Sequence, residues 1–222
     1  MAHSMGHDVL SDFGDRPFGH PLLGLYKNCG FWTHDEAAIL YNIARQLGGG
    51  WLDLGAHTGW TAAHQAAAGC SVTAVDNMLP IKEFAARFEE NIRFLSAGHR
   101  INAFAGSSDE FFAQCGPALF SGVVVDADHC HPHPQRDAEN AMAHLRENGV
   151  ILFHDFIGEP VRRAVTRLLD LGFACRVYWT PHMVACCWRG EVIPPKHARD
   201  PKINWEPVER SMPDFDFARC TL

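Results

Sequence analysis

Residues that could bind a metal or move a proton follow two apolar stretches in the second half of the chain. The segment VVVDADHC places Asp126 directly after one stretch, with Asp128 and His129 just beyond it. The segment GVILFHDF places His154 and Asp155 at the end of the next stretch. Carboxylates and imidazoles are ligands for divalent metals and are also common proton-transfer groups. These residues therefore predict a metal centre with a proton acceptor beside it.

The two segments are expected to meet in space, because ligands of an open α/β sheet bind at the carboxyl ends of its strands. Neighbouring parallel strands lie about 4.8 Å apart, so Asp126 and the pair His154 and Asp155 can converge on one cation. A carboxylate-rich, open site suits Mg²⁺, Mn²⁺ or Ca²⁺, although an imidazole shifts the preference toward a transition metal. A simpler interpretation stays open, in which Asp126 and Asp128 only end a strand and cap the helix after Pro134.

The loop after Asp126 is rich in histidine, because His129, His131 and His133 stand around Cys130. Prolines interrupt this run, and no further ligands follow at the spacing that zinc sites or hydrolytic motifs require. Apart from the role considered for His129, we therefore expect solvent-exposed loop histidines here.

A nucleoside-binding pattern lies upstream. Trp51 to Leu54 is a short apolar run, and Gly55 and Gly59 allow a tight turn in which the backbone can approach a ligand. Asp76 ends the next strand, about 20 residues beyond the turn, where a carboxylate can accept hydrogen bonds from both ribose hydroxyls. A strand, turn and helix without any ligand is the alternative, and the carboxylate of Asp76 argues against it.

The turn lacks the third glycine with which a dinucleotide site normally opens its helix. LDLGAHTG instead resembles the first motif of the class I S-adenosylmethionine-dependent methyltransferases. This resemblance implies that Asp53 lies near the methionine amino end and that Asp76 binds the ribose. His57 stands where a glycine is more usual, so this part of the turn departs from the pattern.

The second pair of segments is similar to the divalent-metal-dependent small-molecule O-methyltransferases. VDADH is similar to the VDADK segment of the caffeoyl-coenzyme A type, and GVILFHD resembles strand five of the macrocin and sugar type. The resemblance implies that Asp126, His154 and Asp155 are the metal ligands, with a histidine where an aspartate is usual. His129 replaces the catalytic lysine of the first type, whereas Asp128 matches the proposed base of the second, so both are candidates for the base.

The resemblance covers approximately residues 33–188 and implies methyl transfer from S-adenosylmethionine to a hydroxyl of a small molecule, with a divalent metal. Three alternatives remain: a metal-independent methyltransferase, a nicotinamide-dependent oxidoreductase and a noncatalytic adenosine-binding protein. Ser107 either lies near the adenine amino group or caps a helix. The expected cofactor-binding residues are Asp53, Gly55, Gly59, Asp76, Ser107 and Asp126.

Alternating strand and helix patterns predict an α/β fold, a doubly wound Rossmann-like sheet of seven strands, mostly parallel, that ends in an antiparallel hairpin. A capping box of Thr33 and Glu36 opens a helix to about Leu47. The apolar positions of an amphipathic helix after Pro80 are expected to pack in the core. The strands are expected at 51–54, 71–75, 101–105, 122–126 and 150–154 and in the hairpin within 173–188.

The 222 residues, of which 47% are hydrophobic, predict one enzyme domain. We expect an N-terminal segment (1–32), the catalytic domain (33–189) and a proline-rich tail (190–222) that acts as a lid or an interface arm. A net charge of -7 argues against nucleic acid as a partner. The absence of a long apolar stretch or signal sequence argues against a membrane and for the cytoplasm. Self-association into a homo-oligomer is left open.

None of the eight cysteines forms a C-x-x-C pair, and several lie in strand-like runs, so buried thiols are expected rather than disulfides or zinc ligands. Tyr26, Phe31 and Trp32 are expected to shape the acceptor pocket. They match no substrate class, so the acceptor is left undefined.

Overall fold

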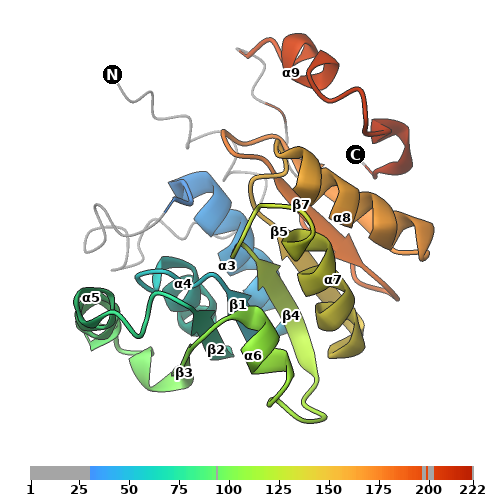
Figure 1. Cartoon of the computed structure of the whole chain (residues 1–222). Helices are drawn as coiled ribbons and strands as arrows, with labels where there is room; N and C mark the ends of the chain where they lie inside the picture. The colour runs from blue at the N-terminus through green and yellow to red at the C-terminus, as the bar shows by residue number, and fades with distance from the viewer. Residues whose placement is uncertain (1–30, 94, 197–198, 200–202, 222) are drawn as a thin grey trace.

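The computed structural model describes residues 31–93, 95–196, 199 and 203–221. Its centre is a seven-stranded sheet in the order β3-β2-β1-β4-β5-β7-β6 (Figure 1). Strands β1 to β5 pair in parallel, and β7 runs antiparallel to both β5 and β6. The predicted doubly wound sheet with a C-terminal hairpin is therefore confirmed. Tyr26 and nearly all of the expected N-terminal segment lie outside the described residues.

The strands lie close to their expected positions. They are β1 (Gly50–Leu54), β2 (Ser71–Asp76), β3 (Ile101–Ala105), β4 (Phe120–Val125), β5 (Leu145–Phe153), β6 (Ala174–Tyr178) and β7 (Val184–Trp188). The main difference is β5, which begins five residues before the apolar run at Val150 because an exposed polar stretch extends it.

Helices cover both faces of the sheet, and an apolar core lies beneath each layer. One layer contains α3 (His34–Leu47), α4 (Trp60–Ala67) and α5 (Lys82–Arg93). The other contains α6 (Ser108–Phe112), α7 (His133–Ala143) and α8 (Glu159–Asp170). Short helical turns occupy 98–100, 206–210 (α9) and 217–219.

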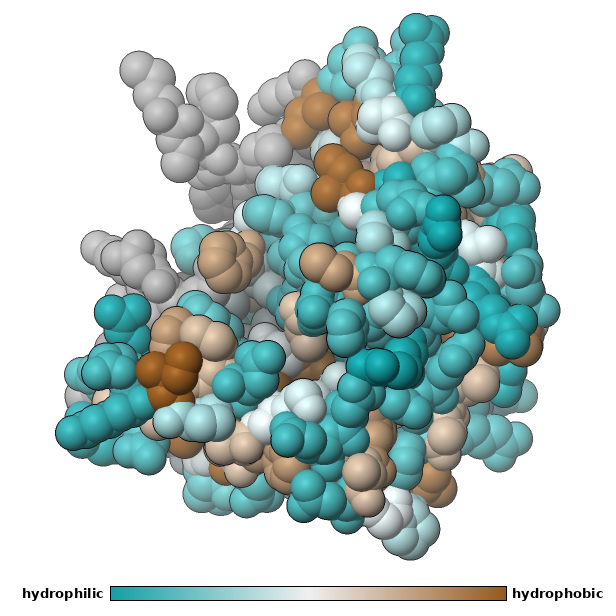
Figure 2. All heavy atoms as spheres, in the orientation of Figure 1, coloured by the Kyte–Doolittle hydropathy of each residue, from teal (hydrophilic) through white to brown (hydrophobic). Residues whose placement is uncertain are grey.

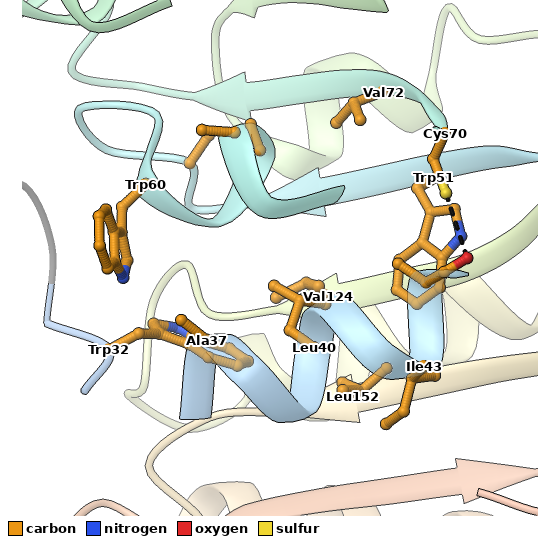
Figure 3. Packing of buried hydrophobic residues seen from close by; sticks show 14 of the residues in the cluster. Trp32, Ala37, Leu40, Ile43, Trp51, Trp60, Cys70, Val72, Val124 and Leu152 are labelled. Atoms are coloured by element: carbon orange, nitrogen blue, oxygen red, sulfur yellow. Dashed lines mark hydrogen bonds between the residues drawn. The ribbon is translucent and has the colours of Figure 1, made fainter. Parts of the chain in front are cut away.

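Helix α3 begins at the predicted capping box. The Thr33 hydroxyl accepts a hydrogen bond from the Glu36 amide at 3.3 Å, and the Glu36 carboxylate accepts one from the Thr33 amide at 2.7 Å. The buried face of this helix packs on the sheet, where Figure 3 shows Leu40 and Ile43 beside side chains of β1, β4 and β5. This packing fixes the helix beside the strand ends that carry the candidate site.

The helix after Pro80 does not bury the whole apolar stripe that was expected to pack in the core. Phe88 is its one buried residue, and Ile81, just before it, is 43% exposed. The Phe84 ring lies 5.3 Å from the His57 ring. The first turn of α5 thus borders the glycine turn and not the sheet, which explains its exposed apolar side chains.

The surface and the cysteines agree with a folded globular unit. Figure 2 shows a face that is mainly hydrophilic, with apolar residues in small separate groups. No helix in the described part of the chain is long and apolar enough to cross a membrane. The seven described cysteines are free, and the four expected to be buried thiols are buried: Cys70, Cys175, Cys186 and Cys187.

Candidate active site

One cavity of about 500 Å³ opens at the carboxyl ends of the parallel strands. Its wall includes the glycine turn after β1, the end of β2, residues 106–109 after β3, residues 126–129 after β4 and Asp155 after β5. The exposed Phe31 and buried Trp32 also line it, as expected for pocket-shaping residues. The nucleoside pattern and the polar strand ends therefore share one cavity.

The backbone geometry of the turn after β1 explains why glycine occupies positions 55 and 59. Gly55 has a φ of +89°, and a Cβ there would lie 2.1 Å from the carbonyl oxygen of Asp126. Gly59 has a φ of +90° and precedes the first residue of α4. Both positions favour glycine because other residues rarely adopt such angles. His57, with a φ of +47°, is a non-glycine exception in the same turn.

Asp76 lies at the end of β2 on the cavity wall, as predicted. One carboxylate oxygen accepts a hydrogen bond from the His57 amide at 2.6 Å, and the other accepts one from the Met78 amide at 2.7 Å. Each carboxylate oxygen has a further lone pair, so hydroxyl donors can still bind. Asp76 thus both closes the turn and offers acceptors to the cavity.

Asp53 lies behind the cavity wall and is fully buried. Its Oδ2 accepts a hydrogen bond from the Thr61 hydroxyl at 2.7 Å, and Thr61 itself lines the cavity. Within the described chain, Oδ1 makes no hydrogen bond. Burial raises the pKa of Asp53 to about 7, against the opposing effect of the Thr61 hydrogen bond. Asp53 is therefore placed to act on a ligand through Thr61.

Ser107 has the helix-capping role that the sequence left open. Its hydroxyl accepts a hydrogen bond from the Glu110 amide at 3.2 Å and donates one to the Glu110 carboxylate at 2.9 Å. Ser107 also lines the cavity, so its capping role leaves it beside any ligand there.

Four residues predicted to bind a metal or act as a base lie close together: Asp126, His129, His154 and Asp155. Oδ1 of Asp126 lies 3.1 Å from Nε2 of His129 and 3.2 Å from Nδ1 of His154. Oδ2 of Asp155 lies 3.3 Å from Nδ1 of His129 and 3.4 Å from Nδ1 of His154. These atoms form a cluster of alternating carboxylates and imidazoles, which we call the His–Asp cluster.

Asp128 lines the cavity but lies outside the His–Asp cluster. Its Oδ1 accepts a hydrogen bond from the Cys130 amide at 2.8 Å, and its Oδ2 lies 3.6 Å from Nε2 of His133. His131 is exposed, as expected for the loop histidines, whereas His129 and His133 make these ionic contacts. The two candidate bases therefore have different partners, because His129 contacts the cluster and Asp128 contacts Cys130 and His133.

Three further residues hold the cluster, and the sequence did not single them out for this role. The Trp32 indole donates a hydrogen bond to Asp126 at 2.7 Å and stacks on the His154 ring. A Glu36 carboxylate oxygen lies 3.4 Å from Nε2 of His154, and the other accepts a hydrogen bond from the His182 amide. The His182 ring contacts Asp155 at 3.0 Å.

The sequence carried a signal for two of these three residues, His182 and Trp32. His182 lies in the hairpin turn, and a hairpin beside strand five brings its turn to the same sheet edge. Glu36 was fully explained by its capping role, and a local pattern cannot reveal its second contact. Trp32 was expected to shape the pocket, which it lines.

The charges in the cluster stabilise one another. Burial alone would lower the pKa of His154, but hydrogen bonds to Asp126, Asp155 and Glu36 raise it to about 11. Burial alone would raise the pKa of Asp155, but hydrogen bonds from His154 and His182 lower it to about 2. The protein therefore holds ionised carboxylates here, as a cation requires, together with a protonated His154, which would have to release its proton before its Nδ1 could bind a cation.

The donor atoms lie close enough together to share a metal ion. Within the described chain, one set that could do so comprises Asp126, His129 and Asp155, and a second comprises His154, Asp155 and His182. Asp155 belongs to both sets. Mixed oxygen and imidazole donors are typical of divalent transition-metal sites.

Comparison with known proteins places this geometry in context. Residues 52–156 match the family model of a methyltransferase domain. No curated protein gave a significant sequence match. Among solved structures, cofactor-bound Rv0187 from MTB is 14% identical, with a TM-score of 0.65, covering 80% of this chain and 92% of that chain.

Two further solved structures share the fold. TomG, an O-methyltransferase of Streptomyces achromogenes involved in tomaymycin synthesis and solved with SAM, is 16% identical, with a TM-score of 0.61 over 83% of this chain and 91% of that chain. An O-methyltransferase of Bacillus cereus solved with SAH is 13% identical, with a TM-score of 0.60 over 82% and 91%.

Proposed function

We propose that this chain is a class I S-adenosylmethionine-dependent methyltransferase, as expected from its sequence, and that it methylates a hydroxyl oxygen of a small molecule. One observation carries the proposal: the glycine turn and Asp76 share a single cavity with Asp126, His129 and Asp155. A nucleoside held at the first end would point its reactive group toward the second. Such orientation can supply several kcal/mol of the barrier.

The first end of the cavity fits S-adenosylmethionine. Asp76 offers acceptors to the ribose hydroxyls, and the glycine turn lines the cavity beside it. Asp53 has a buried oxygen without a hydrogen bond in the described chain and, when ionised, places negative charge behind Thr61. An ammonium group near Thr61 would be stabilised by that carboxylate. When bound, S-adenosylmethionine supplies the methyl group on its sulfonium.

A divalent metal held by Asp126, His154 and Asp155, the ligands expected from the sequence, would take its donors from the two candidate sets that share Asp155. Glu36 faces Nε2 of His154, which leaves Nδ1 turned toward the two aspartates. Metal-binding histidines commonly have such a carboxylate on their second nitrogen. Of the three expected metals, Mn²⁺ best suits this mixed donor set. When bound, it would lower the pKa of an acceptor hydroxyl.

We assign the role of base to His129 and not to Asp128. The His129 side chain is 38% exposed on the cavity wall, within reach of a substrate. Its hydrogen bond to Asp126 raises its pKa, so the imidazolium formed by taking a proton is stabilised. The hydrogen bond from the Cys130 amide instead lowers the pKa of Asp128, which makes that carboxylate a weak base.

A metal-independent methyltransferase is the second candidate, and one observation favours it. The imidazoles of His129, His154 and His182 already face the three carboxylates of the site, Glu36, Asp126 and Asp155. Contacts with carboxylates raise the pKa of His129 and His154, so these two imidazoles would balance the negative charge when protonated and leave His129 to act by positioning and proton transfer.

The proposal is tested by incubating the enzyme with methyl-labelled S-adenosylmethionine, Mn²⁺ and a panel of phenols, catechols and sugars. We expect mass spectrometry to find the label on an oxygen, and most readily in compounds with neighbouring hydroxyls. Label found only on nitrogen or carbon in a wider panel would contradict the proposal. Calorimetry with S-adenosylhomocysteine and NAD provides the binding control, in which only the first should bind.

A further inference from the structure

The described C-terminal tail packs against the segment that carries Asp155. Phe156, the next residue, is fully buried, and its ring lies 4.7 Å from the Phe215 ring at 87°. The Phe217 ring lies 6.2 Å from the same ring. Phe215 is itself buried in the core beneath α8. Tail aromatic residues thus form part of the packing around residue 156.

A buried arginine makes a second connection between the tail and this segment. Arg162 of α8 is 5% exposed and forms two hydrogen bonds of 2.8 Å with the Asp214 carboxylate. The same guanidinium donates a hydrogen bond to the carbonyl oxygen of Ile157. Arg162 therefore joins Asp214 of the tail to the backbone two residues after Asp155.

The joined segment has a backbone that needs support. Asp155 has a φ of +51°, and Met183 in the adjacent hairpin turn has a φ of +59°. The Phe156 amide donates to the Met183 carbonyl at 3.1 Å, and the Gly158 amide donates to the Asp155 carbonyl at 2.8 Å. Left-handed angles at non-glycine residues persist only where surrounding contacts impose them. The contacts of Phe156 and Ile157 are of this kind.

The tail acts from outside the cavity. Figure 1 shows the C-terminal end of the chain beside α8, and no described tail residue is among those that line the cavity. A second ion pair also joins the tail to α8, since Arg219 lies 2.8 Å from Asp170 at the end of that helix. Within the described residues, that second pair makes no hydrogen bond or ion pair with residues 155–158, so it offers a matched control.

We propose that the C-terminal tail is a positioning element of the active site, in which Asp214 and Phe215 act through Arg162 and Phe156 to fix the backbone at Asp155. The proposal rests on the proposed function for the role of Asp155 as a metal ligand. Its structural part, the support of residues 155–158, does not depend on that role.

The test compares Asp214→Ala with Arg219→Ala, because each removes one tail ion pair with α8. For Asp214→Ala we expect the amides of Phe156 and Gly158 to exchange hydrogen at least tenfold faster. We also expect Mn²⁺ to bind at least tenfold more weakly by calorimetry, with S-adenosylhomocysteine affinity within twofold. Arg219→Ala should match the wild type in all three measurements, and Asp214→Glu should recover part of the loss.

Equal exchange at Phe156 and Gly158 in the two alanine variants would overturn the proposal. If the wild-type enzyme does not bind Mn²⁺, the metal assignment fails, but the exchange measurement still decides whether the tail holds this segment. If Asp214→Ala does not fold, Phe215→Leu takes its place, because it keeps an apolar side chain while removing the ring contact with Phe156.

Discussion

The proposed role of the buried Asp53 carboxyl in ligand binding can be tested through its protonation. Because burial raises its pKa to about 7, most molecules carry a proton there at pH 6. A ligand ammonium nearby would favour the ionised carboxylate and so lower its pKa. Binding at pH 6 should therefore release a proton, whereas binding at pH 8.5 should not release it from this group.

Calorimetric titration of S-adenosylhomocysteine at pH 6, in buffers with different ionisation enthalpies, measures that proton. We expect the observed heat to depend on the buffer in the wild type. The dependence should be smaller in Asp53→Asn, which keeps the shape of the side chain but cannot ionise. Identical buffer dependence in the two proteins would show that Asp53 does not respond to the ligand.

The two candidate bases are distinguished by kinetics. His129→Ala should lower kcat by roughly 100-fold or more, the usual contribution of general base catalysis, and should remove the acidic limb of the pH–rate profile. Asp128→Ala should retain that limb and most of the turnover, because its carboxylate faces Cys130 and His133. Steady-state rates from pH 5 to 9 provide the measurement. Loss of the acidic limb in Asp128→Ala alone would reverse the assignment.

At the scale of elements, helix α3 both packs its apolar face in the core and contacts the His–Asp cluster through Glu36. Thr33 and Glu36 share the capping box, but only Glu36 also reaches His154, where both side chains are fully buried. Thr33→Ala should therefore cost about 1 kcal/mol of stability through the lost cap. Glu36→Ala should cost more, up to roughly 3 to 5 kcal/mol, because it also removes one of the three carboxylates that face the buried His154.

Urea denaturation of Thr33→Ala and Glu36→Ala provides the comparison, with Glu36→Gln as the conservative variant. The glutamine keeps one acceptor for the cap and much of the side-chain volume. It should lie between the other two variants in stability. Equal losses in Thr33→Ala and Glu36→Ala would indicate that Glu36 contributes only as a cap.

Sequence patterns predicted which strand ends carry the site but not all of the contacts that its side chains make. The glycine turn, Asp76 and the strand-end residues were predictable because strand ends of a parallel sheet meet at one edge. Asp128 shows a limit of this logic, since spacing places a residue in a loop but does not set the direction of its side chain. Glu36 shows another limit, because its contact with His154 spans 118 residues and depends on tertiary packing.

For helix α5, the apolar stripe was a correct sign of a helix but a poor guide to burial. Its period of about 3.6 residues predicts one apolar face. That face extends beyond the core to the glycine turn, where Phe84 meets His57. The periodicity could not distinguish a face that packs on the sheet from one that borders a cavity.

At the scale of the whole molecule, we propose that one end of the cavity binds the nucleoside and the other end promotes methyl transfer. The end proposed to bind the nucleoside is built from the turns after β1 and β2. The His–Asp cluster follows β4 and β5 and is contacted by residues of the β6–β7 hairpin and α3. Substitutions in the cluster should therefore affect transfer much more than nucleoside binding. The tail contributes from outside by supporting one strand end.

The most direct test of this account measures methyl transfer by the wild type and by Asp126→Ala, before and after exhaustive chelation and after Mn²⁺ is restored. We expect chelation to abolish methyl transfer and Mn²⁺ to restore it only in the wild type. Asp126→Ala should still bind S-adenosylhomocysteine with nearly unchanged affinity. Full activity after chelation, or unchanged turnover in Asp126→Ala, would contradict the metal site and leave a methyltransferase that works by positioning alone.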